Sequence, residues 1–325
     1  MTIDILLLIV SIALLYWGAE RLVSHSSWLA KGIGISPLII GSTVIAFGTS
    51  APELLVSTIA SLEKNSAIAL GNVIGSNIAN IGLILGLVIL FFPPKPEERA
   101  ARREFPFLVI VSLFLFIFSL DGSIGRFDGL MLIALFVVFI SYNIMTVRKR
   151  MLRKFEKEIG ETEKKIESII SRKTKEKRPL YNLLFSLIGL MVLLAGSHLL
   201  VKSAVSIAAS IGVSQMVIGL SIVALGTSLP ELVVSVVASI KKEERINLGM
   251  VLGSNTFNTL LILGVAALIL PIPVEKRDVY INMPIMLLFT IAVFPVLKEN
   301  IKTYRLIGLF FLLGYFSFIF YSFFS

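Results

Sequence analysis

The sequence repeats itself at a constant offset, the shift that aligns Gly34 with Gly212. Residues 34–61 align with residues 212–239 without a gap, and more than half of the aligned positions are identical. The matches include the polar strings GTSAPE and GTSLPE, and GSNIAN at 75–80 corresponds to GSNTFN at 253–258. Chance similarity between apolar segments would scatter Leu and Val matches and would not align polar strings. The chain therefore contains two copies of one structural unit.

Long apolar runs alternate with short polar breaks along the chain. Only 16% of the 325 residues are charged, whereas an ordinary soluble domain has about 25%. Runs of about 20 apolar residues are long enough to cross a bilayer as helices. We therefore predict an all-α membrane protein with ten transmembrane helices, surrounded by the lipid bilayer, and not an enzyme. The predicted spans are approximately 3–23, 35–61, 67–92, 105–120, 127–147, 180–201, 213–240, 246–270, 279–297 and 304–324.

Basic residues are concentrated in segments that the ten-span plan places on one side of the membrane. Residues 148–178 hold 13 Lys and Arg, and placing this loop in the cytoplasm puts both termini outside. The cytoplasmic side then carries 25 of the 30 Lys and Arg, as the positive-inside rule requires. We predict a multi-pass protein of the cell (plasma) membrane with extracellular termini. Because topology accounts for the net charge of +9, the charge does not indicate a nucleic-acid partner.

Each copy of the repeat belongs to a half with five predicted spans. Because five is odd, the two copies must enter the membrane in opposite orientations, which makes them an inverted repeat. The halves are residues 1–147 and 179–325, joined by the basic cytoplasmic linker 148–178. The linker alternates Lys and Glu, which fits either a short exposed helix or a mobile tether. Inverted repeats are typical of secondary transporters, whose substrate site lies near the midplane between the repeats.

Two glutamates, Glu53 and Glu231, occupy matched positions in the middle of otherwise apolar spans. An ionisable side chain within a membrane is costly, so each is a candidate functional residue. A structural hydrogen bond would explain one buried glutamate, but it explains a matched pair poorly. We predict that the two carboxylates bind an ion jointly.

Hydroxyl oxygens accompany both glutamates. In a helix, Thr49 precedes Glu53 by four residues and shares its face, and Thr227 has the same relation to Glu231. Two further hydroxyls lie one step round the helix, on Ser50 and Ser228.

A proline directly precedes each glutamate. Proline has no N–H, so it deprives a carbonyl in the preceding turn of its donor and loosens the carbonyls just before it. The loosened carbonyls belong to Ala46 or Phe47 and to Ala224 or Leu225. Carbonyls freed at membrane depth are tolerated where they line a cavity or ligate an ion.

The third predicted span carries a polar stripe. Asn72, Ser76 and Asn80 recur every four residues and share one helix face. The corresponding residues of the second copy are Met250, Ser254 and Asn258. The neighbouring Asn77 and Asn255 are either ligands or interhelical hydrogen-bonding groups. The matched glycine pairs, 71 with 75 and 249 with 253, are predicted to allow close helix packing.

The candidate ligands are carboxylates, hydroxyls, amides and carbonyls. The chain has no cysteine and only two histidines, so thiolate and His-rich metal sites are excluded or disfavoured. An all-oxygen set suits the hard cations Ca²⁺, Mg²⁺, Mn²⁺ and Na⁺. Ca²⁺ is favoured because two glutamates neutralise its charge and because its coordination is flexible. We expect no cofactor and no obligate protein partner.

These paired motifs closely resemble those of the cation/calcium exchanger superfamily, and the nearest branch resembles the prokaryotic sodium/calcium exchangers. The resemblance covers both repeats and the ten-span plan, leaving out only the linker. It implies Na⁺-driven Ca²⁺ antiport by alternating access, with Ca²⁺ and Na⁺ as the transported ions. The first and sixth spans would be the moving elements, since they lack the polar motifs of the repeat.

The resemblance also implies roles for individual residues. Ca²⁺ would be coordinated centrally by Glu53, Glu231, Thr49 and Thr227. The Na⁺ site towards the cytoplasm would use Ala46, Thr49, Ser50 and Ser76, and the site towards the outside Ala224, Thr227, Ser228 and Ser254. Asn80 and Asn258 would complete the middle of the site. The family often has an aspartate at one of these last two positions, so the two asparagines leave the coupling stoichiometry and any K⁺ dependence open.

Three rival functions remain at this point. A Ca²⁺/H⁺ antiporter of the same architecture would use the glutamates as proton carriers, whereas the flanking hydroxyls favour Na⁺. An ion channel usually builds its pore from oligomeric symmetry, and an internal inverted repeat suits alternating access better. An intramembrane hydrolase using Ser50 or Ser228 would need a base beside the serine, and both histidines are far from these motifs in the sequence.

Overall fold

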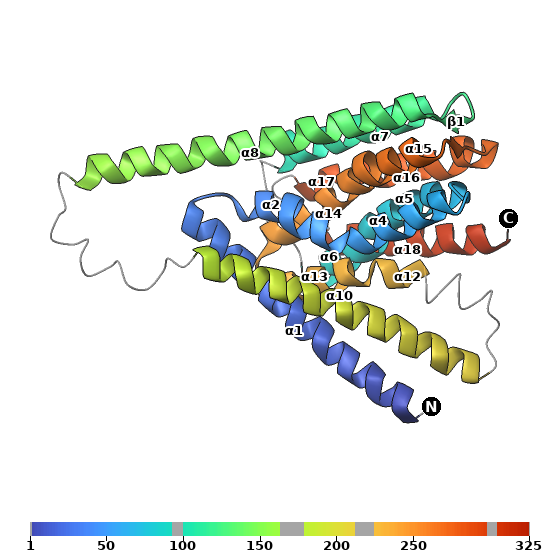
Figure 1. The fold of residues 1–325 in the computed structure, drawn as a ribbon, viewed down its shortest axis with the longest axis horizontal. Coiled ribbons are helices and arrows are strands. Elements are labelled where there is room, and N and C mark those ends of the chain that lie inside the picture. Colours follow the sequence, from blue (N-terminus) through green and yellow to red (C-terminus); the bar gives the residue numbers. More distant parts are fainter. Residues whose placement is uncertain (1, 93–99, 163–178, 212–223, 298–303, 325) are drawn as a thin grey trace.

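The computed structural model describes residues 2–92, 100–162, 179–211, 224–297 and 304–324 as an almost entirely helical protein. Figure 1 shows the helices packed as a bundle, with α8 extending beyond the rest of the molecule. The ends of the described chain, in α1 and α18, lie at the end of the bundle opposite to the projecting end of α8. Seven helices are long and apolar enough to cross a membrane, or eight if one bent pair counts as a span. The protein is therefore a multi-pass membrane protein.

The first half of the chain folds into helices that follow the first five predicted spans, extend the first and fifth, and include residues 100–104 before the fourth. Segments labelled η are π-helical turns. The helical elements of this half, in chain order, are α1 (Thr2–Ile33), α2 (Pro37–Ile40), η1 (Gly41–Ile45), α3 (Ala46–Thr49), α4 (Ala51–Leu62), α5 (Ala67–Ala79), η2 (Asn80–Leu85), α6 (Gly86–Phe91), η3 (Ala100–Glu104), α7 (Phe105–Phe118) and α8 (Arg126–Thr162).

The second half follows the same plan over its described residues. Its elements are α10 (Pro179–Ser210), α12 (Ala224–Thr227), α13 (Leu229–Ile240), α14 (Glu244–Phe257), η5 (Asn258–Ile262), α15 (Leu263–Ile269), η6 (Asp278–Asn282), α16 (Met283–Ala292), α17 (Phe294–Leu297) and α18 (Tyr304–Phe324). The only strands among the described residues are β1 (Ser123–Ile124) and β2 (Ile272–Pro273), which pair antiparallel and join the two halves.

Element boundaries recur at the same offset that relates the two copies in the sequence. The first residues of α4 and α7 are equivalent, at this offset, to the first residues of α13 and α16. The π-helical turns η2 and η5 begin at the equivalent residues Asn80 and Asn258. Even the positive φ angles of Lys64 (66°) and Lys242 (59°) correspond. The two copies of the repeat therefore share their local structure as well as their residues.

Three helices run further than the apolar residues predict. The helices α1 and α10 continue well past the expected spans, and α8 continues through the charged residues 148–162. Lys, Arg and Glu are good helix formers, so an exposed charged segment prolongs a helix without needing apolar contacts. The first part of the predicted linker is thus helical, and residues 163–178 lie outside the described residues.

The second predicted span is bent at the motif. Pro37–Thr49 and Ala51–Leu62 meet at an angle of 45° at Ser50. Proline at the start of α4 explains the bend, because its ring crowds the preceding turn and removes one backbone hydrogen bond. The same break recurs at Ser228 between α12 and α13. Of the predicted partner span, residues 213–223 lie outside the described residues.

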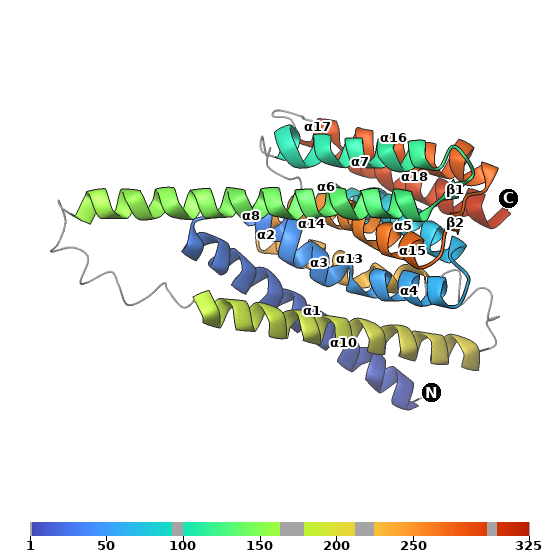
Figure 2. The same cartoon turned by 45° about the horizontal axis from the view of Figure 1, so that its top comes forward.

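Helices α1 and α10 lie side by side and cross at one flank of the bundle (Figure 2). Glycines permit the crossing: a Cβ added to Gly18 would lie 2.5 Å from the backbone nitrogen of Leu193. Two ion pairs fasten α1 to the turn between α13 and α14. They join Glu20 to Lys241 at 2.6 Å and Lys31 to Glu243 at 2.8 Å.

The predicted glycine faces have different surroundings in the two copies. A Cβ on Gly249 would lie 2.3 Å from the carbonyl oxygen of Leu38, and one on Gly253 would lie 2.6 Å from Ser42. Helix α14 therefore packs directly on the backbone of α2 and η1. No described atom lies within 4 Å of such a Cβ on Gly71 or Gly75.

Candidate cation-binding site

The two motif glutamates lie at the breaks between helices. Glu53 and Glu231 occupy the first turns of α4 and α13, and each is 1% exposed. The positive end of a helix dipole stabilises a negative charge in its first turn. This explains in part how two carboxylates are accommodated within an apolar bundle.

A serine of the first repeat contacts the glutamate of the second. The hydroxyl of Ser50 donates to Oε1 of Glu231 over 3.3 Å. The two carboxylates are also close enough to interact electrostatically with each other. The structure thus brings together Ser50, Glu53 and Glu231, three predicted residues from two motifs that lie in opposite halves of the sequence.

Several buried oxygens at this place have no hydrogen-bond partner among the described residues. They are Oε2 of Glu53, Oε2 of Glu231, Oδ1 of Asn80, Oδ1 of Asn258 and the hydroxyl of Ser254. Buried polar atoms are nearly always paired in folded proteins, and leaving one unpaired costs about 1–3 kcal/mol. All five can act as acceptors, and all belong to residues that the sequence predicts as cation ligands. Bound cations would satisfy these acceptors.

The hydroxyl of Thr49 hydrogen-bonds to the backbone of its own helix turn. Thr49 is fully buried and donates to the carbonyl oxygens of Ile45 and Ala46, at 3.1 and 3.4 Å. Its oxygen lone pairs are therefore available to a cation. Thr227 occupies the matching position at the end of α12, directly before the break, where it is half-buried.

The remaining predicted residues flank this centre. Ala46 begins α3 and its carbonyl still accepts the backbone N–H of Ser50 at 3.0 Å, so the proline break leaves this hydrogen bond in place. Ala224 begins α12. Ser76 and Ser254 are buried in α5 and α14. The roles of these four residues as Na⁺ ligands stay predictions.

The stripe on the third span divides into two parts. Asn72 donates from Nδ2 to the carbonyl oxygen of Glu53 (3.3 Å) and to the hydroxyl of Ser57 (3.0 Å). It therefore holds α4 against α5 and does not offer this amide group to an ion. Ser76 and Asn80, one and two turns further on, are buried.

The structure places Asn77 and Asn255 as hydrogen-bonding groups between the helices. Nδ2 of Asn80 donates to Oδ1 of Asn255 at 2.9 Å, and Nδ2 of Asn258 donates to Oδ1 of Asn77 at 3.1 Å. Both alternatives had remained open from the sequence. The Oδ1 atoms of Asn77 and Asn255 therefore both have hydrogen-bond donors.

The second half also contains a buried polar cluster that the repeat could not reveal. Asn247 accepts from Ser235 (2.7 Å) and donates to Ser239 (3.1 Å). The equivalent residue of the first copy is Ala69, so comparison of the copies gives no signal here. Only the rarity of asparagine in an apolar span marks Asn247.

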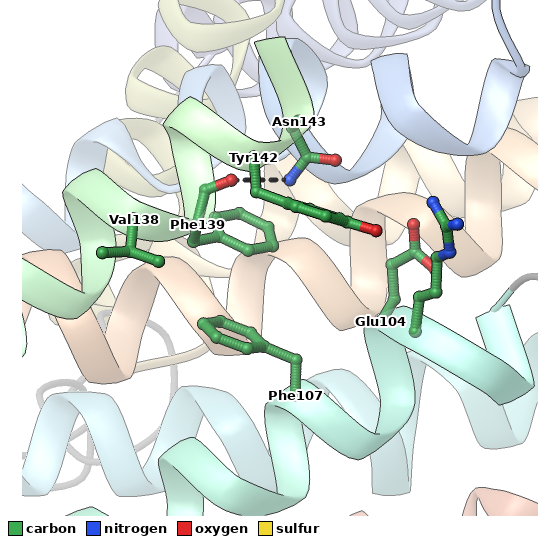
Figure 3. Close-up of a pocket in the computed structure, with 7 residues that line it drawn as sticks. Glu104, Phe107, Val138, Phe139, Tyr142 and Asn143 are labelled. Carbon is green, nitrogen blue, oxygen red and sulfur yellow. Dashed lines mark hydrogen bonds between the residues drawn. The ribbon is translucent and has the colours of Figure 1, made fainter. Parts of the chain in front are cut away.

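One cavity of about 320 Å³ lies away from this centre, between the start of α7 and α8 (Figure 3). Its walls are mainly apolar, and the amide of Asn143 donates within it to the carbonyl of Phe139 at 3.0 Å. None of the predicted ligands lines it. The candidate ligands lie instead at the breaks of the broken helices and on α5, η2, α14 and η5.

The chain is similar in sequence and in fold to known membrane exchangers. A model of the sodium/calcium exchanger protein family matches residues 3–145 and 181–324. The putative antiporter CaxA of Alkalimonas amylolytica is 35% identical over 292 residues, which cover 87% of each chain. The sodium/calcium exchanger MaX1 of Methanosarcina acetivorans is 28% identical over an alignment of 345 residues, covering 98% of each chain. A solved structure of the sodium-calcium exchanger NCX_Mj, soaked with Na⁺ and Sr²⁺, is similar with a TM-score of 0.81 and 30% identity over 97% of each chain.

Proposed function

Because this chain belongs to the sodium/calcium exchanger family, within the cation/calcium exchanger superfamily, we propose that it exchanges Na⁺ for Ca²⁺ by alternating access. The family consists of membrane transporters, so cation/calcium antiport is its general activity. The proposal adds the coupling ion and the residues that bind each ion.

The observation that carries the proposal is the set of unpaired buried acceptors. Two carboxylate oxygens, two amide oxygens and one hydroxyl come from both repeats and lack partners among the described residues. Ca²⁺ takes six to eight oxygen ligands, and two glutamates balance its charge. Emptying the site of any cation would leave two buried carboxylates to repel each other, so a cation must be present for both to stay ionised.

We propose Glu53, Glu231, Thr49 and Thr227 as the Ca²⁺ ligands, with Asn80 and Asn258 completing the centre. Na⁺ would occupy flanking sites. The cytoplasmic one would consist of Ala46, Thr49, Ser50 and Ser76, and the extracellular one of Ala224, Thr227, Ser228 and Ser254. Because Na⁺ and Ca²⁺ share oxygens in this arrangement, filling the site with one ion excludes the other. Mutual exclusion of this kind is what couples the two fluxes.

The architecture that we propose has ten transmembrane helices in two inverted five-helix repeats, residues 1–147 and 179–325. The recurring element boundaries support the two-repeat division. We place the 148–178 linker in the cytoplasm and both termini outside the cell, in the plasma membrane. The position of both chain ends opposite to the projecting end of α8 supports this topology (Figure 1).

We propose α1 and α10 as the elements that move between the inward-open and outward-open states. They cross on backbone contacts at glycines and lie together at one flank of the bundle. Because these close contacts join α1 to α10, the two helices would move together. The two ion pairs from α1 to the α13–α14 turn would stabilise α1 in one of these two states.

A Ca²⁺/H⁺ antiporter is the alternative. One relative is named only as a putative antiporter, so the names of the relatives leave the coupling ion open. Glutamates that bind Ca²⁺ can also carry protons. The two asparagines of the centre are neutral, so Glu53 and Glu231 would be the proton carriers in such an antiporter.

Uptake of ⁴⁵Ca²⁺ into proteoliposomes separates these functions. Vesicles are preloaded with Na⁺ or with choline, each with and without a pH gradient. Uptake that needs internal Na⁺ and is lost in Glu53→Gln and Glu231→Gln would support the proposal. Uptake that follows the pH gradient regardless of Na⁺ would refute Na⁺ coupling and move the protein to the proton-coupled branch.

A further inference from the structure

The asparagines of the GSNxxN strings form a crossed arrangement between the two repeats. Asn77 and Asn80 lie three residues apart at the end of α5, as do Asn255 and Asn258 at the end of α14. The side-chain amide of Asn80 donates to Asn255, and that of Asn258 donates to Asn77. Each candidate ligand is therefore held by the other repeat and not by its own.

An asparagine can present either end of its amide to a cation. The oxygen attracts the ion, and the NH₂ group repels it. Since Nδ2 of Asn80 and of Asn258 is bound by the opposite asparagine, each Oδ1 must face the other way. Both Oδ1 atoms are buried and have no partner among the described residues. The hydrogen bonds at Nδ2 thus decide that oxygen faces the proposed cation.

The orientation of Asn255 is fixed by a backbone carbonyl. Nδ2 of Asn255 donates to the carbonyl oxygen of Asn77 at 3.1 Å. A backbone carbonyl is only an acceptor, so turning the Asn255 amide over would bring two oxygens together. Oδ1 of Asn255 must therefore face Asn80, which in turn must offer its NH₂ group.

The orientation of Asn77 is fixed through a hydroxyl relay. Thr259 donates its proton to the carbonyl oxygen of Asn255 at 2.9 Å, so its oxygen can only accept from Asn77. Nδ2 of Asn77 donates to that oxygen at 3.0 Å and to the sulfur of Met286 at 3.6 Å, which leaves Oδ1 of Asn77 for Asn258. The residue equivalent to Thr259 in the first copy is Ile81. The relay therefore exists only in the second repeat.

We propose that Asn77, Asn255 and Thr259 are positioning residues that fix the polarity of the Asn80 and Asn258 amides across the repeat interface. This proposal rests on the proposed Ca²⁺ site. All three residues are 1% exposed or less, and hydrogen bonds link them to one another. A buried hydrogen-bond network favours a single arrangement, in the way that outer-shell partners orient metal ligands.

The mildest test is Thr259→Val, with Thr259→Ser as its matched control. Valine keeps the shape but removes the oxygen acceptor that orients Asn77. Only the sulfur of Met286, a weak acceptor at 3.6 Å, then remains for the Asn77 amide, so the Asn258 amide loses its fixed polarity. We expect the Ca²⁺ dissociation constant of the purified full-length protein, measured by titration calorimetry without Na⁺, to rise about tenfold. Thr259→Ser keeps the hydroxyl and should stay within about threefold of wild type. Equal affinities for Thr259→Val and wild type would overturn the relay.

A carboxylate has oxygen at both ends and needs no orienting partner. Asn258→Asp should therefore restore Ca²⁺ binding of Thr259→Val to the level of Asn258→Asp alone, whereas Asn80→Asp should not. The same test applies to Asn255, which orients Asn80. Asn80→Asp should restore the Ca²⁺ binding of Asn255→Leu, and Asn258→Asp should not. A purely structural role predicts no such pairing, so equal rescue by both aspartates would refute the proposal.

Two further measurements distinguish a folding defect and a failure of the proposed Ca²⁺ site from a failure of the positioning proposal. The thermal unfolding midpoint shows whether Asn255→Leu folds, and Thr259→Val carries the test if it does not. Glu231→Gln tests the underlying site. If Glu231→Gln keeps Ca²⁺ binding, the proposed site itself fails. If it loses binding while Thr259→Val is unaffected, only the positioning proposal fails.

Discussion

Replacing Glu231 by glutamine removes one charge from the proposed site and almost nothing else. The carboxylate is 1% exposed, and its Oε1 accepts from Ser50 at 3.3 Å. A glutamine has the same shape and keeps an oxygen that can accept this bond. The variant should therefore fold, and its defect should be confined to the ion.

The size of the defect follows from the burial. Removing one partner of a buried ion pair costs about 3–5 kcal/mol, because the other charge is left uncompensated. Since each 1.4 kcal/mol is about a factor of ten, the Ca²⁺ dissociation constant should rise roughly 10²–10⁴-fold. Titration calorimetry of the purified protein in Na⁺-free buffer measures this directly.

Glu104→Gln is the matched control. Glu104 is also buried, at 7% exposure, but it lines the cavity between α7 and α8 in Figure 3. This variant loses a buried carboxylate of the same kind away from the candidate site, so its Ca²⁺ affinity should stay within about threefold of wild type. If Glu231→Gln also stayed within threefold, or if both variants lost binding equally, the reasoning would be wrong.

Three other predictions concern the neighbouring contacts. Ser50→Ala removes a hydrogen bond to the Glu231 carboxylate, so Ca²⁺ affinity should fall about tenfold, and an unchanged titration would contradict this role. Gly249→Ala places a methyl group 2.3 Å from a carbonyl oxygen and should lower stability by about 1–3 kcal/mol; thermal unfolding measures it, and Gly32→Ala, which meets no described atom within 4 Å, should not lower it. Glu20→Lys reverses one charge of the pair with Lys241, so the ⁴⁵Ca²⁺ uptake rate should change, and adding Lys241→Glu should restore it to within about twofold; no recovery in the double variant would exclude a role for this pair.

The repeat made the centre of the candidate site accessible from sequence. Glu53 and Glu231 stand out because each is an isolated charge in an apolar span and because each marks the other. The structure places both in first helical turns and pairs Glu231 with Ser50 of the other repeat. Matching positions in two copies carry information that a single motif would not.

Other features depend on contacts that a linear comparison cannot contain. The crossed bonds between Asn77 and Asn258 and between Asn80 and Asn255 join residues on different helices. Asn247 has no polar counterpart in the first copy. The asymmetry at Thr259, opposite Ile81, is visible in the sequence but has meaning only once the hydrogen bonds are known.

The fold was predictable in outline and less so in detail. Apolar runs located the helices, and seven of those described, or eight with the bent pair, are long and apolar enough to cross a membrane. The count of ten stays a prediction, and residues 213–223 of the seventh predicted span lie outside the described residues. Charged residues prolong α8 beyond its apolar part, since helix formation does not require burial. The pairing of β1 with β2 joins residues from opposite halves of the chain and has no local signal.

The central claim is that Na⁺ and Ca²⁺ compete for one buried site that contains both glutamates. Calorimetric Ca²⁺ titrations of the wild-type protein at increasing Na⁺ concentrations test it most directly, with choline keeping the ionic strength constant. The account predicts one displaceable Ca²⁺ per chain, with an apparent dissociation constant that rises steadily with Na⁺. A dissociation constant that does not change with Na⁺ would contradict the account, because the two ions would then bind independently.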